Sequence, residues 1–311
     1  MRVVFMGTPD FSVETLEEII TAEHEVVGVV TQPDKPRGRS GQMQATPVKE
    51  VALRHDLPVY QPVRVKEAEF VETLRMMNPD IIVVVAFGQI ISQEILDLPK
   101  YGCINVHASL LPKYRGAAPI QWAIIDGEEK TGITIMQMDA GLDTGDMIAT
   151  TEIEIGKDET GGSLFDKLSE AGAKLLVKTL ADIEAGNITH TPQPKDSPTP
   201  YAKMIKKQMG QIDWNEEGEV IERLVRGLNP WPSAYTSIEG KTLKLWQTLL
   251  SEEESEYKAG MIVKIDSSTI WVQTGKGILG IIELQLEGKK RMRTTDFLRG
   301  FEIKVGDILG K

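Results

Sequence analysis

The sequence has few of the residues that form disulfide cross-links or bind a metal ion. Its 311 residues include one cysteine, Cys103, and four histidines. One cysteine cannot form an internal disulfide, and no His or Cys pair has the spacing of a zinc site. We therefore expect no disulfide framework and no metal, and a cytoplasmic location is the simplest setting for such a chain.

Long apolar runs are also missing. Hydrophobic residues make up 41% of the chain, yet no run approaches the roughly 18 residues that a membrane-spanning helix needs. The opening stretch RVVFM has the pattern of a strand and lacks the long apolar core of a signal peptide. We expect no membrane partner.

Basic residues are fewer than acidic ones, which gives the chain a net charge of -11. Net charge is a weak guide to partners when basic residues cluster along the chain. Any one cluster is more often a solvated face than a binding site, but several in one acidic chain favour a polyanionic partner. The clusters are Lys35, Arg37 and Arg39; Lys113 and Arg115; Lys203, Lys206 and Lys207; and Lys289, Lys290, Arg291 and Arg293.

Strand and helix patterns alternate over residues 1–186. Short β-branched or continuous apolar runs are separated by amphipathic stretches, which predicts an α/β fold with a Rossmann-like, doubly wound sheet. In the first turn, GTPDF, we expect Thr8 to cap the following helix. The further glycines of a dinucleotide fingerprint are absent, so NAD is not expected. The strand runs are 2–6, 25–30, 80–87, 132–139 and 146–155, and the helical stretches lie near 9–22, 47–55, 66–76 and 160–185.

The texture changes after residue 186. Residues 187–208 begin with NITHTPQPKDSPTP, whose four prolines indicate a semi-rigid linker. Residues 209–311 contain one helical stretch and several short strands with turns such as EGK and GKG. This pattern predicts a small OB-like β-barrel as a second domain.

The stretch NVHASLLPKYRG, residues 105–116, places two polar side chains at a strand end. Asn105 and His107 are two residues apart and point to the same face, and the run Ser109 to Pro112 then ends the strand. Ligands of α/β sheets bind beyond the carboxyl ends of strands, where an amide and an imidazole can polarise a carbonyl. The alternative is a pair of core polar groups bonded to neighbouring backbone. Cys103 shares the face but lies roughly 13 Å from His107, so we interpret it as a small buried hydrophobe.

The second notable stretch, DAGLDTGD, places Asp143 between two glycines. Taken alone it is best interpreted as a turn aspartate. A metal loop with Asp139 and Asp146 matches no calcium-binding spacing. If an amine attacks a carbonyl at this site, however, a carboxylate near the histidine can orient the ring and move protons.

Together these two stretches resemble the paired motifs of the folate-dependent formyltransferases. GTPDF, TQPDKPRGR, YRGAAPIQWAI and LNPWPSAY are similar to the members that act on methionyl-tRNA, and the resemblance extends from residue 1 to beyond 290. The loop at 33–47 departs from it, with Ser-Gly-Gln where lysines are expected.

The resemblance implies transfer of the formyl group of 10-formyltetrahydrofolate to the amine of methionyl initiator tRNA. Glycinamide ribonucleotide or a nucleotide aminosugar is the alternative acceptor. The alternative function of a different class is that of a non-catalytic RNA-binding module. Asn105 and His107 then stabilise the developing oxyanion, while Asp143 sets the state of the histidine. The implied folate-binding residues are Ser109, Leu110, Leu111 and Pro112.

The basic clusters are the expected contacts to tRNA phosphates. The loop at 32–47 has too little apolar surface to order itself on the protein, so we expect it to be mobile in the free enzyme and to become ordered against the acceptor end of tRNA. The resemblance implies that the barrel helps to hold the tRNA, and the enzyme is expected to be a monomer. The expected tRNA-binding residues are Lys35, Arg37, Arg39, Lys206, Lys207, Lys289 and Lys290.

Overall fold

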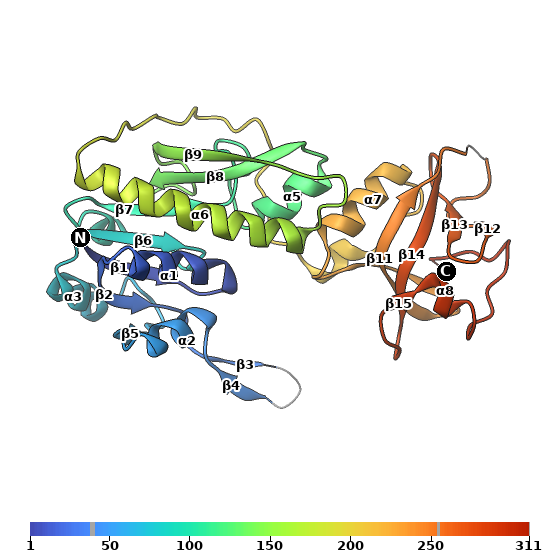
Figure 1. Ribbon diagram of the computed structural model, residues 1–311, viewed down its shortest axis with the longest axis horizontal. Helices are drawn as coiled ribbons and strands as arrows, with labels where there is room; N and C mark the ends of the chain where they lie inside the picture. Colours follow the sequence, from blue (N-terminus) through green and yellow to red (C-terminus); the bar gives the residue numbers. More distant parts are fainter. Residues whose placement is uncertain (38–40, 254–255, 311) are drawn as a thin grey trace. The chain divides into compact units, whose positions relative to one another are not determined.

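The computed structural model describes residues 1–37, 41–253 and 256–310, and the chain divides into two compact units (Figure 1). Unit 1 and unit 2 are not consecutive stretches, because two short segments from the first 186 residues belong to unit 2. Unit 1 comprises Met1–Pro119, Lys130–Glu154 and Phe165–Ala202, and unit 2 comprises Ile120–Glu129, Ile155–Leu164 and Lys203–Lys311. No helix within the described ranges is long and apolar enough to cross a membrane.

A seven-stranded sheet forms the centre of unit 1 and confirms the predicted Rossmann-like class. Five strands are parallel, and the last two, β8 and β9, pair antiparallel at one edge. The sheet order is β5 (Val59–Tyr60), β2 (Glu25–Val30), β1 (Arg2–Gly7), β6 (Ile81–Val85), β7 (Cys103–His107), β8 (Lys130–Gln137) and β9 (Met147–Glu154).

The order of the strands reverses between β1 and β6. The chain passes from β1 to β2 on one side and then returns to β6 and β7 on the other, so the carboxyl ends of β1 and β6 flank a switch point where ligands bind in this class of sheet. The helices of this half are η1 (Asp10–Ser12), α1 (Val13–Thr21), α2 (Pro47–Arg54), α3 (Ala68–Met77), α4 (Gln93–Leu96), α5 (Pro119–Ile125) and α6 (Gly161–Glu184).

Both faces of the sheet are covered, which explains the continuous apolar run IIVVV in β6. On one face, Val84 of β6 and Cys103 of β7 join the buried cluster that contains Leu74 of α3. On the other face, α6 runs along the sheet (Figure 1), and a Cβ added to its Gly172 would lie 3.0 Å from Cγ1 of Val106. Alternate residues of β7 therefore point to opposite layers, as the strand pattern predicts.

The loop at 32–47 carries a two-stranded hairpin in its described residues, which the sequence pattern did not predict. β3 (Lys35–Arg37) pairs antiparallel with β4 (Gln42–Gln44). At the base of the hairpin, Lys49 Nζ lies 2.6 Å from Asp34 Oδ2 and 2.8 Å from Gln61 Oε1, and Gln61 Nε2 donates to Asp34 Oδ1 at 2.7 Å. Composition hid the hairpin, because polar bonds at its base replace the missing apolar contacts.

Unit 2 is built on an antiparallel sheet, in agreement with the small β domain predicted for the C-terminal third. Its path runs β10-β11-β14-β13-β12, and β15 pairs with β14. The elements are η2 (Lys207–Gly210), α7 (Gly218–Gly227), β10 (Ala234–Ile238), β11 (Lys241–Leu250), β12 (Ile262–Ile265), β13 (Ile270–Gln273), β14 (Ile278–Leu286), β15 (Met292–Arg293) and α8 (Thr294–Phe297).

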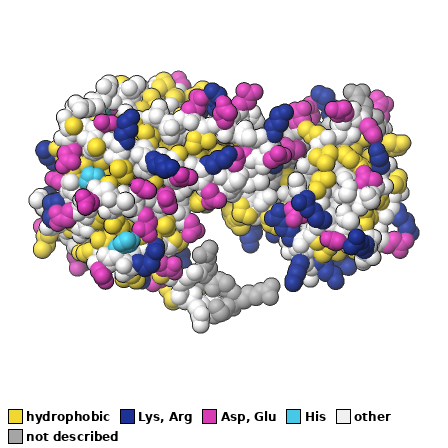
Figure 2. Space-filling model, viewed as in Figure 1, with side chains coloured by type: hydrophobic (Ala, Val, Ile, Leu, Met, Phe, Trp, Pro, Cys, Tyr) yellow, Lys and Arg dark blue, Asp and Glu magenta, His cyan; other side chains and the backbone are white. Residues whose placement is uncertain are grey.

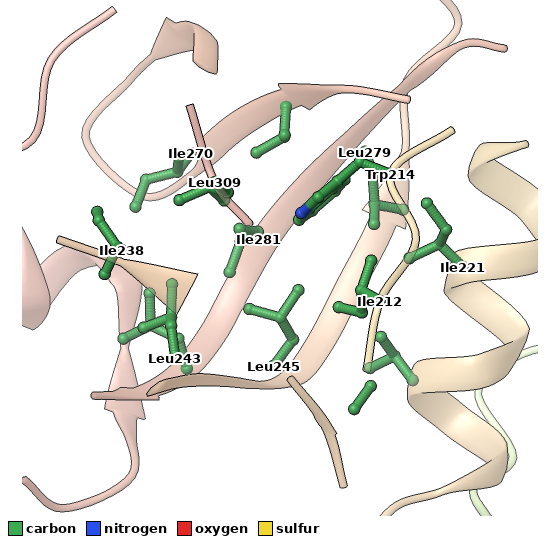
Figure 3. Packing of buried hydrophobic residues seen from close by; sticks show 14 of the residues in the cluster. Ile212, Trp214, Ile221, Ile238, Leu243, Leu245, Ile270, Leu279, Ile281 and Leu309 are labelled. Carbon is green, nitrogen blue, oxygen red and sulfur yellow. The ribbon is translucent and has the colours of Figure 1, made fainter. Parts of the chain in front are cut away.

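The core of unit 2 lies inside this bent sheet. Figure 3 shows Leu243 and Leu245 of β11 pointing toward Ile281 of β14, with Trp214 among them. The Trp214 indole N–H donates to Thr236 Oγ1 at 3.0 Å, so its polar atom is satisfied within the core. The EGK turn between β10 and β11 has positive φ at both Glu239 and Gly240, as the predicted tight hairpin requires.

Residues 187–202, hereafter the strap, pack along unit 1 rather than standing free of it. Thr191 forms two backbone hydrogen bonds with Met147 of β9, each 2.9 Å long. Farther along, the Ala202 N–H donates to the Arg115 carbonyl at 2.8 Å, and the Ala202 carbonyl accepts from Ala117. Prolines fix the extended path of the strap, while its other residues supply the bonds to unit 1.

Candidate active site

The carboxyl end of β7 presents the polar pair that the sequence analysis identified. Cys103, Asn105 and His107 share one face of the strand, and Val106 lies on the other, against α6. In the sheet, Asn105 pairs with Val84 of β6 and with Met136 of β8. Asn105 is half-buried, and among the described residues nothing accepts from or donates to its amide. Its hydrogen-bonding groups are therefore free for a ligand.

Cys103 is a core residue, as predicted. Its side chain is fully buried, and Sγ contacts the Ile95 carbonyl at 3.6 Å. Burial, with a smaller effect from Asp97, raises the pKa of the Cys103 thiol to about 12. Because the thiolate is the nucleophilic form of cysteine, this thiol is unsuited to covalent catalysis near neutral pH.

The two nitrogens of His107 have different partners. The ring is 6% exposed, and Nε2 lies 3.0 Å from the Tyr114 carbonyl. A carbonyl only accepts, so Nε2 carries a hydrogen and the neutral ring has its lone pair on Nδ1. Nδ1 lies 3.8 Å from Asp143 Oδ1. The nitrogen that can take up a proton therefore faces the carboxylate.

Asp143 lies in a loop whose backbone conformation restricts which residues can occupy it. Its φ is 56°, in the left-handed region, and Oδ2 accepts the Gly116 N–H at 2.9 Å. A Cβ at Gly145 would lie 1.7 Å from the Gln137 carbonyl oxygen, so glycine is required there. Asp139 accepts the Gly141 N–H at 2.9 Å and caps the loop as a turn residue. In the part of the chain that the structure describes, no cluster of three His, Cys, Asp or Glu side chains forms a metal site.

The turn after β7 is fixed by buried hydroxyl groups. Ser109 Oγ donates to the Lys113 carbonyl at 2.7 Å. Thr134 Oγ1 donates to the Ser109 carbonyl at 2.7 Å and accepts the Leu111 N–H at 3.1 Å. The Ser109 hydroxyl is thus used inside the protein. Leu110 and Pro112, which are half-buried, are the members of the predicted folate segment that remain partly accessible.

The carboxyl end of β6 lies beside β7 and turns sharply. Ala86 and Gly88 have positive φ, and Phe87 between them is 2% exposed. Thr8 Oγ1 donates to the Phe87 carbonyl at 3.1 Å and makes no helix cap, so the predicted cap is wrong. The hydroxyl joins the ends of β1 and β6, because the helix begins two residues farther on.

The strap supplies site residues that sequence reasoning missed. Its Gln193 contacts the Asp143 loop, Ser197 Oγ donates to the Pro112 carbonyl at 2.7 Å, and Thr199 Oγ1 accepts the Tyr114 N–H at 2.7 Å. The prolines of this segment were interpreted only as the sign of a linker. Polar residues between prolines were the available clue, since an extended chain directs alternate side chains toward one surface.

The basic clusters include both accessible and internally bonded residues. Arg115 is 8% exposed and bonds to the strap, while Arg291 pairs with Glu283 and lies 4.7 Å from the Trp246 ring centroid. Figure 2 shows Lys and Arg side chains gathered along the lower edge of unit 2 in that view. Among the described residues, no carboxylate pairs with five exposed lysines of the predicted tRNA set: Lys35, Lys206, Lys207, Lys289 and Lys290. Arg39 lies outside the described residues, and of Arg37 only the backbone, at the end of β3, is described.

Comparisons with known proteins agree over the whole chain. The Formyl transferase family model matches residues 1–180, and the model of the Formyl transferase C-terminal domain matches residues 204–302. The chain is 60% identical over 308 residues to the methionyl-tRNA formyltransferase of Agathobacter rectalis, with 99% of each chain covered. It is 49% identical over 310 residues to that of Clostridioides difficile, with all of each chain covered.

Solved structures share the fold at lower identity. The sugar 3N-formyl transferase WlaRD, solved with dTDP and 5-N-formyl-THF, has a TM-score of 0.66 and 18% identity, covering 93% of this chain and 99% of its own. HypX from Aquifex aeolicus, in complex with tetrahydrofolic acid, has a TM-score of 0.63 and 18% identity, covering 98% of this chain and 50% of its own.

Proposed function

The chain belongs to the formyl transferase family, and we propose that it transfers the formyl group of 10-formyltetrahydrofolate to the α-amine of methionyl initiator tRNA. The observation that carries this proposal is the placement of His107 Nδ1 3.8 Å from Asp143 Oδ1, on the strand face that also presents Asn105. The family membership supplies the donor and the acceptor, and the geometry supports the chemistry between them.

The transfer proceeds by attack of the amine nitrogen on the formyl carbon. A bond forms between them, and the formyl oxygen takes up negative charge. Asn105, whose amide has no partner among the described residues, is placed to donate to that oxygen. A positioned donor of this kind contributes about 2.7 to 4 kcal/mol to lowering the barrier.

Proton movement falls to His107 and Asp143. The attacking nitrogen must lose a proton, and Nδ1 of the neutral ring is the acceptor that faces the site. The protonated ring is then an electrostatic partner for both the oxyanion and the Asp143 carboxylate. When the carbonyl re-forms, the bond to N10 of the folate breaks, and the proton passes to that nitrogen. No covalent enzyme intermediate is needed, in keeping with the buried Cys103.

The domains have separate tasks in this proposal. Residues 1–186 bind the folate, with Leu110, Leu111 and Pro112 in the turn that follows β7, and Ser109 holds that turn in shape. Residues 209–311 hold the tRNA through Lys289 and Lys290, which have no carboxylate partner among the described residues, with 187–208 between the two domains. An aminoacyl-tRNA acceptor places the enzyme in the cytoplasm, and we propose that it acts as a monomer.

The test offers one labelled donor to three acceptors. Purified enzyme with formyl-labelled 10-formyltetrahydrofolate is given methionyl initiator tRNA, glycinamide ribonucleotide or a nucleotide aminosugar, and the product is identified. We expect label on the tRNA, at a kcat/KM at least 100-fold above either small amine. Label on a small amine in preference to the tRNA contradicts the assignment of acceptor, and no labelled product contradicts the reaction.

A further inference from the structure

The side chain of Gln193 connects the strap to both sides of the active site. Its Nε2 donates to the Asp143 carbonyl at 3.0 Å and to the Gly145 carbonyl at 2.7 Å. Its Oε1 accepts from Arg115 Nε at 3.0 Å and from Arg115 Nη2 at 2.9 Å. Both donors and both lone pairs of the amide are used, and only one orientation fits, since carbonyls cannot donate and a guanidinium cannot accept.

Arg115 is the fixed end of this connection. Besides Gln193, its guanidinium donates to the Pro194 carbonyl at 2.7 Å and to the Lys195 carbonyl at 3.1 Å. Neutral oxygens of the strap therefore satisfy a charge that is 8% exposed, and a buried charge is tolerated only when it is well hydrogen-bonded. The planar donor fork sets where the amide oxygen of Gln193 must lie.

The backbone at Asp143 needs such support. Its positive φ is costly for a residue with a side chain, so neighbouring contacts must hold it. Gly116, next to Arg115 in the chain, donates its N–H to Asp143 Oδ2 at 2.9 Å. A closed ring of contacts thus runs from the Asp143 carboxylate through Gly116, Arg115 and Gln193 back to the Asp143 carbonyl.

We propose that Gln193 is a positioning residue for catalysis, which fixes the Asp143 carboxylate against Nδ1 of His107, and that Arg115 orients Gln193 for this task. The proposal rests on the proposed formyl transfer. It gives the strap a second purpose besides joining two parts of the chain, because the strap sets the geometry of the carboxylate that faces the proton-accepting nitrogen of His107.

Gln193→Glu separates positioning from simple attachment. The carboxylate keeps its bonds to Arg115, now as an ion pair, so the strap stays attached. It has no N–H to give, and an anionic oxygen then faces the carbonyls of Asp143 and Gly145. We expect kcat to fall about 10- to 100-fold, as a small misplacement of a catalytic group causes, while the KM for the folate changes less than about threefold. Because the ion pair with Arg115 offsets part of the lost bonds, the melting temperature should fall by only about a few degrees.

Lys195→Gln is the matched control. It lies two residues away on the strap, lowers the net charge by one as Gln193→Glu does, and retains the backbone carbonyl that accepts from Arg115. Its exposed side chain has no described role in the ring of contacts, so kcat should stay within about twofold of wild type. If Gln193→Glu does not fold, Gln193→Met, which keeps the length but has no donor, takes its place.

A double-mutant cycle with Asp143→Asn decides the matter. If Gln193 acts through the carboxylate, Gln193→Glu lowers kcat in the wild type but has little further effect in the Asp143→Asn background. An equal loss in both backgrounds, or a Gln193→Glu enzyme with wild-type kcat, overturns the proposal. The cycle is run with whichever amine the wild type formylates, so a wrong acceptor assignment would show in the acceptor test and leave the cycle interpretable.

Discussion

Individual side chains at the end of β7 differ in how fully their polar groups are used. The Ser109 hydroxyl and Nε2 of His107 are bonded to backbone carbonyls, while the Asn105 amide has no partner within the described residues. Free polar groups beside bonded ones mark the side chains that a ligand contacts, because a core amide is normally satisfied by the protein.

Asn105→Ala and His107→Ala should each lower kcat by about 100-fold or more, the usual effect of losing one oxyanion donor or a general base. A single-turnover formylation assay, quenched at successive times with saturating donor, measures the chemical step directly. Cys103→Ala, on the same strand face, is the control, and its rate should stay near wild type because its thiol is buried away from the site. A fast His107→Ala enzyme, or a slow but folded Cys103→Ala enzyme, contradicts these assignments.

Asp143→Asn keeps the size of the side chain and an oxygen that can accept from Gly116. It removes the charge near Nδ1 of His107. We expect kcat to fall about 100-fold with a much smaller change in folate affinity, since in the proposed reaction the carboxylate supports proton uptake by His107 and does not hold the donor. Equilibrium binding of the folate, measured beside the rate, separates the two effects. Lost affinity with normal turnover at saturation contradicts this role.

At the scale of whole elements, the β3–β4 hairpin depends on a few polar bonds at its base. Hydrogen bonds from Lys49 and then Gln61 hold the pKa of the Asp34 carboxyl below its usual range. A lowered folded-state pKa means that the carboxylate contributes stability above its unfolded pKa of about 3.9 and loses it as the pH falls through the folded value. The hairpin should therefore keep this support at any pH between 5 and 8.

Asp34→Asn should loosen the hairpin. We expect amide exchange in β3 and β4 to quicken several-fold at pH 7, by the same factor at pH 5 once intrinsic exchange rates are corrected. Glu50→Gln on α2, an exposed residue in its first turn, is the control and should leave exchange unchanged. An effect that vanishes at pH 5 would mean that the pKa of Asp34 is raised in the folded protein instead of lowered.

The same hairpin presents Lys35 to solvent. Lys35→Ala should raise the KM for methionyl-tRNA and leave the KM for the folate unchanged. Each lost phosphate contact lowers the slope of log affinity against log salt by about 0.7 to 0.9. The salt dependence of tRNA binding checks this, with Lys66→Ala, another exposed lysine of unit 1, as the control. Equal slopes for the two variants would remove Lys35 from the tRNA surface.

Elements with strong periodicity were predictable from the sequence, and those held by polar bonds were not. β2 occupies the predicted residues, and α2 ends within one residue of its predicted limit. The proximity of His107 and Asp143 was predictable from the two motifs that contain them, since both residues lie beside the same edge of the sheet. The β3–β4 hairpin and the contacts of Gln193 were not predicted. Single polar side chains define them, whereas periodicity in a sequence indicates only apolar faces.

The whole chain does not divide at a single point such as the predicted domain start at residue 209. Residues 120–129 and 155–164 belong to unit 2. Arg223 Nε of α7 donates to the Ile125 carbonyl at 3.1 Å, and Arg226 Nη1 donates to the Glu159 carbonyl at 3.0 Å. A Cβ at Gly227 would lie 2.6 Å from Ile125 Cγ1, so α5 and α7 are closely packed.

A fragment of residues 1–208 should therefore be less stable than its own sheet would suggest. It retains α5 but lacks the whole of α7, leaving carbonyls and apolar side chains of α5 without their partners. We expect a melting temperature several degrees below that of the full chain and binding of a dye for exposed apolar surface. A fragment that melts as the full chain does and binds no dye would show that residues 120–129 are stable without α7.

The backbone bonds between Thr191 and Met147 have a consequence for solubility. β9 is the last strand of the sheet, and among the described residues only Thr191 pairs with the backbone N–H and C=O groups on its outer side. Free strand edges are templates on which another chain adds as a further strand. The strap covers the beginning of this edge, and its prolines cannot donate hydrogen bonds to an incoming chain. A protease nick in the strap would uncover β9 and favour aggregation of otherwise folded molecules.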